Sequence, residues 1–95
     1  MTQEKTIEKI VADNRVAINH VILGQGEALP VHNANAFVYQ IITRGTMKQA
    51  LENREAELHP AGTILAIREG CKMAIENGGT DILEFFIIKA PAPEV

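Results

Sequence analysis

The sequence is poor in the residues that build disulfide-rich or aromatic-rich proteins. It has one cysteine, Cys71, no tryptophan, and aromatic residues make up only 4% of the chain. A single cysteine cannot form a disulfide within the chain, which excludes a small disulfide-stabilised scaffold. A free cysteine suits a reducing compartment, so we expect a cytoplasmic location.

Concentrated positive charge and long apolar runs are also missing. The nine Lys and Arg residues are scattered among twelve Asp and Glu residues. Nucleic-acid binding needs a basic cluster, so no nucleic-acid partner is expected. No apolar run approaches the roughly 20 residues of a membrane span, and residues 1–5 lack the apolar segment of a signal peptide. We therefore expect no membrane partner.

What the chain does contain is short runs rich in β-branched residues. The 95 residues predict a single domain, 1–95, with a modest core that a partner subunit would help to stabilise. Turn signals such as Asn77-Gly78-Gly79 separate the runs. Regular short strands of this kind predict an all-β fold, either a sandwich or a barrel. The predicted strands are 16–23, 37–43, 47–51, 55–58, 63–67, 73–76 and 82–88.

The two ends of the chain are less clearly patterned. Ile7, Ile10 and Val11 have helix-like spacing, although a strand is equally compatible with residues 1–15. The proline-containing segment 90–95 is expected to be extended and loosely held.

Two runs carry regularly spaced glycines. In the first, Gly26 is followed by five residues and His32, and the run continues to Gly45. In the second, Gly62 is followed after seven residues by Gly70, and Met73 and Asn77 come next.

This spacing resembles the two motifs of the cupin superfamily. The first family motif is glycine, five residues, His-x-His, three or four residues, Glu, six residues and glycine; the second is glycine, five residues, Pro-x-Gly, two residues, His, three residues and Asn. The resemblance spans about 20–89 and implies a small cupin-type β-barrel, a double-stranded β-helix or jelly roll. Residues 1–15 would be an N-terminal extension and 90–95 a C-terminal tail. A homodimer is expected, because small cupins commonly pair.

The resemblance also implies that the usual metal site is degenerate. The four metal ligands of the family map onto His32, Ala34, Val38 and Met73, and only His32 is a ligand of the family type. A metal centre needs several ligands, so no metal or other cofactor is expected. One alternative is a soft transition-metal site made by His32, Cys71 and Met73, since imidazole, thiolate and thioether suit Cu(I). The simpler interpretation, which we favour, is that Met73 and Cys71 fill the core.

Strand alternation suggests which polar residues face inward. Successive residues of a strand point to opposite faces. The resemblance places Val38 inside the barrel, so Gln40 should face inward as well. The apolar alternation of Met47 and Leu51 places Gln49 on the inner face, unless a bulge reverses the direction. An outer-surface position of either glutamine remains the alternative.

These residues define a candidate small-molecule site. A few polar groups in an apolar cavity are typical of such sites. The candidate ligand-binding residues are His32, Gln40, Gln49 and Met73. His20 and His59 have no counterpart among the family ligands and are expected to be surface or strand residues.

Three functions fit this pattern. The favoured one is a metal-free cupin-like protein that binds a small organic ligand. The second is a metal-dependent enzyme with an altered ligand set around His32, or one that uses His32 as a general base. The third is a structural or assembly module that pairs through apolar outer-face residues such as Tyr39, Ile41 and Phe86. No catalytic residue is identified, so an enzyme is less favoured.

Overall fold

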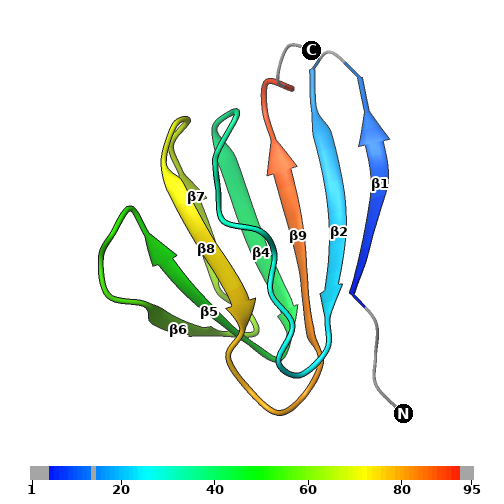
Figure 1. Cartoon of the computed structure of the whole chain (residues 1–95). Helices are drawn as coiled ribbons and strands as arrows, with labels where there is room; N and C mark the ends of the chain where they lie inside the picture. The colour runs from blue at the N-terminus through cyan, green and yellow to red at the C-terminus, as the bar shows by residue number, and fades with distance from the viewer. Residues whose placement is uncertain (1–4, 14, 93–95) are drawn as a thin grey trace.

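The structure, a computed structural model, describes residues 5–13 and 15–92 (Figure 1). Within these ranges the chain forms strands and no helix, and so no helix that could cross a membrane. The all-β prediction is therefore confirmed. The strands are β1 Thr6–Ala12, β2 Ala17–Leu23, β3 His32–Asn33, β4 Val38–Arg44, β5 Thr46–Leu51, β6 Glu57–Pro60, β7 Ile64–Ile67, β8 Lys72–Asn77 and β9 Leu83–Lys89.

The strands form two antiparallel sheets. The five-stranded sheet has the order β1-β2-β9-β4-β7, and the four-stranded sheet has the order β3-β8-β5-β6 (Figure 1). Consecutive strands β4 and β5 lie in different sheets, as expected for a jelly roll. One apolar core joins the sheets: it contains Val21, Ile42 and Phe85 from the first and Met47 and Ile75 from the second.

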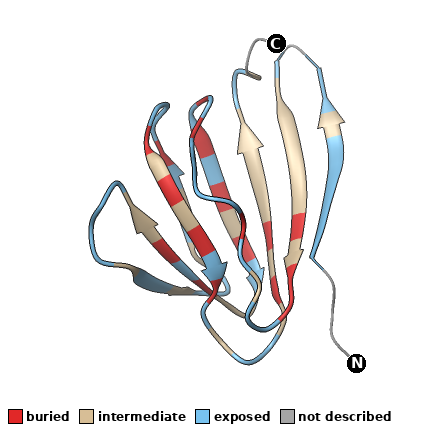
Figure 2. Cartoon of the chain, viewed as in Figure 1, coloured by how far each residue is buried: buried red, intermediate tan, exposed pale blue. Residues whose placement is uncertain are grey.

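Side-chain alternation along the central strands is as predicted. Figure 2 shows buried positions alternating with exposed or intermediate ones along β4 and β8. Val38, Gln40 and Ile42 are buried, as are Met47 and Gln49 on β5. The inward orientation of both glutamines is therefore confirmed, and Tyr39 and Ile41 are left on the outer face.

Residues 6–12, whose conformation the sequence left open, form the edge strand β1. Its pairing with β2 shifts register between Lys9 and Val11. This β-bulge breaks the period of two and produces the helix-like spacing of Ile7, Ile10 and Val11. The short strand β3 was not predicted, because two residues carry no periodic signal. The predicted loose tail lies partly outside the described residues, at 93–95.

Asn77 holds the end of β8 against the five-stranded sheet. Its buried amide nitrogen donates hydrogen bonds to the carbonyl oxygens of Leu23, at 3.0 Å, and Asp81, at 2.8 Å. Its side-chain oxygen accepts from the Gly79 amide at 2.9 Å. The asparagine of the second motif therefore closes the turn before β9 and satisfies backbone groups that would otherwise be unpaired.

His20 links β2 to both neighbouring strands on the outer face. Its Nδ1 lies 2.7 Å from Glu8 on β1, and its Nε2 lies 2.5 Å from Glu84 on β9. The ring stacks on Phe86, with centroids 4.6 Å apart. The hydrogen bond to the Glu8 carboxylate is the largest cause that raises the pKa of His20, and the Glu84 carboxylate adds to it. The His20 imidazolium therefore holds the edge strand β1 to the rest of the sheet, and we call this set of contacts with Glu8 and Glu84 the His20 clamp.

This clamp predicts a pH-dependent stability. Because the folded-state pKa of His20 is raised, its contribution is complete below the unfolded value of about 6.5 and is lost as pH rises through the folded-state pKa. We expect the Tm of the wild type to decrease as the pH rises through the folded-state pKa of His20. The decrease should be smaller in His20→Gln. His59→Gln is the control, because the His59 ring lies 4.0 Å from Glu57 at one exposed contact. Equal pH profiles for His20→Gln and the wild type would contradict the clamp.

Candidate functional site

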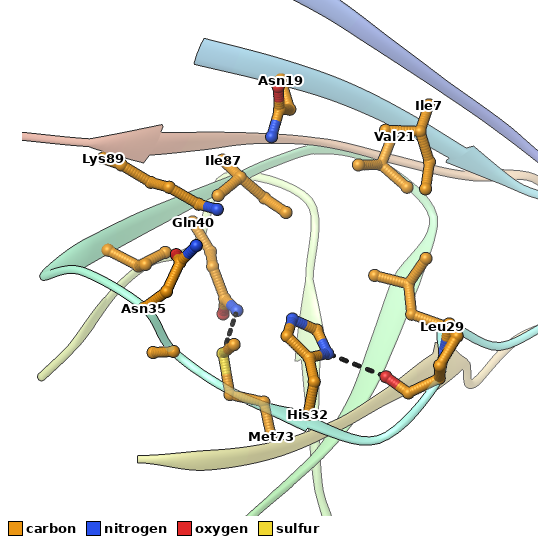
Figure 3. A pocket seen from close by; sticks show the side chains of 13 residues that line it. Ile7, Asn19, Val21, Leu29, His32, Asn35, Gln40, Met73, Ile87 and Lys89 are labelled. Atoms are coloured by element: carbon orange, nitrogen blue, oxygen red, sulfur yellow. Dashed lines mark hydrogen bonds between the residues drawn. The ribbon is translucent and has the colours of Figure 1, made fainter. Parts of the chain in front are cut away.

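A cavity of about 170 Å³ opens at the β3 end of the molecule, between the two sheets (Figure 3). Its wall is mainly apolar, with a few polar side chains among the aliphatic ones. The lining residues are Ile7, Asn19, Val21, Leu29, Pro30, His32, Ala34, Asn35, Val38, Gln40, Met73, Ile87 and Lys89.

All four positions that correspond to the family's metal ligands line this one cavity. His32 and Ala34 belong to one segment at β3, whereas Val38 lies on β4 and Met73 on β8. The pairing of β3 with β8 places His32 directly opposite Met73, and Val38 starts β4 in the other sheet. The fold therefore brings together the positions that the two motifs share, although three of the four residues differ from the family pattern.

His32 has a defined tautomer in its neutral form. Its Nδ1 lies 2.8 Å from the carbonyl oxygen of Pro30 (Figure 3). A carbonyl can only accept, so Nδ1 must donate and Nε2 carries the lone pair. His32 is exposed at the edge of the cavity. It offers one hydrogen-bond acceptor, or one metal-ligand atom, to whatever enters.

Gln40 and Gln49 form a reciprocal amide pair across the two sheets. The Gln40 amide nitrogen donates to the Gln49 oxygen at 3.0 Å, and the Gln49 nitrogen donates to the Gln40 oxygen at 2.7 Å. The second contacts of these nitrogens are sulfur atoms, Met73 at 3.7 Å and Met47 at 3.6 Å. Gln40 lines the cavity, whereas Gln49 lies behind it and holds the Gln40 amide in place.

The donor atoms at the family's ligand positions do not fit the usual cupin metal. Ala34 and Val38 have no donor atom, and the sulfur of Met73 accepts from Gln40. His32 Nε2 is left as one strong ligand where a metal needs three or four. Across the residues that the structure describes, no three His, Cys, Asp or Glu side chains are grouped to hold an ion.

Cys71 is separated from the other residues proposed for a soft-metal site. His32 and Met73 line the cavity, but Cys71 is buried in the core and is not among the lining residues. Burial raises the pKa of the Cys71 thiol, and the neighbouring Glu52 raises it further. Both effects disfavour the thiolate that a soft ion would bind.

Two polar lining residues, Asn19 and Lys89, were missed by the sequence reasoning. Asn19 is on the inner face of β2 with Val21, and Lys89 is on the inner face of β9 with Ile87. The alternation of side chains along each strand could have indicated that Asn19 and Lys89 face inward. The predicted strand 82–88 ended one residue before Lys89. Asn35, which is close to His32 in the sequence and lies in the loop after β3, also lines the cavity, as its position beside His32 suggested.

Two facing antiparallel sheets with a cavity at one end define a double-stranded β-helix protein. The sequence comparison finds an uncharacterized protein of Methanocaldococcus jannaschii that is 42% identical over 90 residues, which cover 95% of this chain and 78% of the relative. Its crystal structure is described as an RmlC-like cupin with a double-stranded β-helix fold. The two structures superpose with a TM-score of 0.90 over 93% of this chain and 81% of the relative. The chain belongs to the cupin family.

More distant structures share the fold alone. The cupin domain of Schizosaccharomyces pombe Cnp3 is 14% identical with a TM-score of 0.84, over 97% of this chain and 69% of that domain. A putative mannose-6-phosphate isomerase of Ralstonia eutropha is 13% identical with a TM-score of 0.79, over 94% of this chain and 86% of that protein. No family model matches the chain. Because such different proteins share the fold, function has to be argued from the cavity.

Proposed function

We propose that this cupin binds a small organic molecule in the cavity and does so without the family's usual metal. The observation that carries the proposal is the replacement of ligand atoms by apolar side chains at positions that still meet in one cavity. Ala34, Val38 and Met73 make its wall apolar, while His32 and Gln40 supply a few fixed polar contacts. This is the usual composition of a small-molecule site.

The size of the cavity sets the size of the ligand. An engineered cavity of about 150 Å³ in another protein binds benzene. The cavity of about 170 Å³ is therefore suited to a body of that size, and its open end lets a ligand extend past His32. Sugars with many hydroxyl groups are disfavoured, because most of the wall cannot accept or donate hydrogen bonds.

A thermal-shift screen with cavity variants tests the proposal. A ligand at about 100 times its Kd stabilises by about 2.7 kcal/mol, which corresponds to about 10 °C in a domain of this size. We expect Ala34→Leu, which fills the cavity, to abolish that rise. Ala36→Leu is the matched control, because Ala36 is also buried but does not line the cavity. Ligands that stabilise both variants equally would contradict binding at this site.

Elemental analysis of protein purified without chelator or histidine tag, with copper measured under reducing conditions, tests the metal-free part. We expect well below one ion per chain. A stoichiometric metal that is lost in His32→Ala would instead support an enzyme with an altered ligand set around His32.

We also propose a homodimer, supported by the apolar outer face of the five-stranded sheet. Ile64 is 64% exposed, Tyr39 41% and Phe37 39%, and Ile41 and Phe86 share this face. Exposed apolar patches on a small domain commonly mark an interface. A measurement of the molar mass of the protein in solution tests whether it forms this dimer. A reducing, cytoplasmic setting is proposed from the free Cys71.

A further inference from the structure

The charged groups of the cavity are all potential cations. Of the thirteen described residues that line it, only His32 and Lys89 are titratable, and none is Asp or Glu. The chain as a whole is acidic, with a net charge of -3. Glu8 and Glu84, the acids of β1 and β9, face the opposite side and contact His20. Within the part of the chain that the structure describes, the cavity wall therefore has no acidic side chain, although the protein has a net negative charge.

Lys89 supplies this charge from the inner face of β9. Its backbone pairs with Ala17 on β2 and Val38 on β4, so the side chain emerges between two neighbours on the cavity side. Figure 3 shows it reaching from β9 toward the middle of the cavity. Lys9 is on the same side of β1, opposite Asn19. Burial, with the charge of Lys9, lowers the pKa of Lys89, and no carboxylate among the described residues compensates its cation.

Hydrogen-bond donors at the same end are also unused. Among residues 5–13 and 15–92, no side-chain hydrogen bond or ion pair is formed by Lys89, Asn19 or Asn35. Each asparagine amide offers two N–H donors. By contrast, the amide of Gln40 deeper in the cavity is already paired with Gln49. These donors therefore line the same cavity as the lysine, while the aliphatic side chains of Ile7, Val21 and other residues form the remaining wall.

We propose that the ligand is a small organic carboxylate, whose head group is bound by Lys89 with Asn19 and Asn35 and whose apolar body fills the cavity. This inference rests on the proposed function. A carboxylate suits the site better than a phosphate does. It carries one charge, and one lysine with neutral amides can match it, whereas phosphate sites usually add arginines or backbone amides.

Binding of matched probes by isothermal titration calorimetry tests this inference. Benzoate and benzamide share the same ring, but only benzoate carries a charge. We expect benzoate to bind about tenfold to a hundredfold more tightly, as for a hydrogen bond to a charged group. The preference should disappear in Lys89→Met and persist in Lys89→Arg. Lys48→Met is the control, because Lys48 lies outside the cavity, 3.5 Å from Glu76.

The alternative outcomes separate the two proposals. If benzamide binds as tightly as benzoate, the carboxylate inference is overturned and the small-molecule function stands. If inorganic phosphate binds as tightly as benzoate, the site is a general anion site and the inference is also overturned. If neither benzoate nor smaller carboxylates bind, the inference fails. Failure of neutral compounds as well would overturn the proposed function.

Discussion

Replacing Gly45 by alanine is expected to lower the free energy of unfolding by about 3 kcal/mol or more, a large part of the stability of a domain of this size. Gly45 joins β4 to β5 with a φ of 81°, which L-residues adopt at a cost of about 1–2 kcal/mol. A Cβ there would also clash with the carbonyl oxygen of Ile82 and lie 3.0 Å from the Leu83 Cα. These are backbone atoms at the start of β9, so they cannot rotate away.

Gly26→Ala separates the two causes. Gly26 has a φ of 80°, but a Cβ there meets no atom within 4 Å. It should therefore lose only the conformational cost, about 1 kcal/mol. Urea denaturation of both variants and the wild type measures the difference. Equal losses of unfolding free energy in the two variants would show that the close approach of the Ile82 backbone does not constrain Gly45.

Replacing one glutamine of the Gln40–Gln49 pair is expected to lower the free energy of unfolding more than replacing both. Gln49→Met should destabilise the protein by about 1–3 kcal/mol, because it leaves the fully buried Gln40 amide without its partner. Gln40→Met should have a similar effect on Gln49. The double variant replaces both amides by unbranched apolar side chains of similar length. It should lie within about 1 kcal/mol of the wild type.

A double-mutant cycle measures this coupling. We expect the double variant to be more stable than the sum of the single losses predicts by about 1–3 kcal/mol. Additive losses would mean that each amide is satisfied in another way, for example by water. The double variant also removes the polar amide of Gln40 from the cavity wall, so it tests whether that amide contributes to ligand binding.

The sequence predicted the strands and their inner faces well, because both signals are local. The β-rich runs became β2 and β4 to β9, and Gln40 and Gln49 face inward as alternation required. The motif spacing placed His32 and Met73 in one cavity. The local pattern did not predict the structure where its period of two was interrupted. The bulge after Lys9 hid β1, and the predicted strand 82–88 stopped short of Lys89.

The sequence by itself determined the fold class, the cupin spacing and the absence of side-chain donor atoms at Ala34 and Val38, because each follows from residue type and position along the chain. Only the tertiary structure decided which polar groups are paired and which are free. Gln40 meets Gln49 across the two sheets, whereas Lys89 and Asn19 reach the cavity without a side-chain partner among residues 5–13 and 15–92. Such pairing depends on strands that are distant in sequence but adjacent in the sheets, and no local pattern records that neighbourhood.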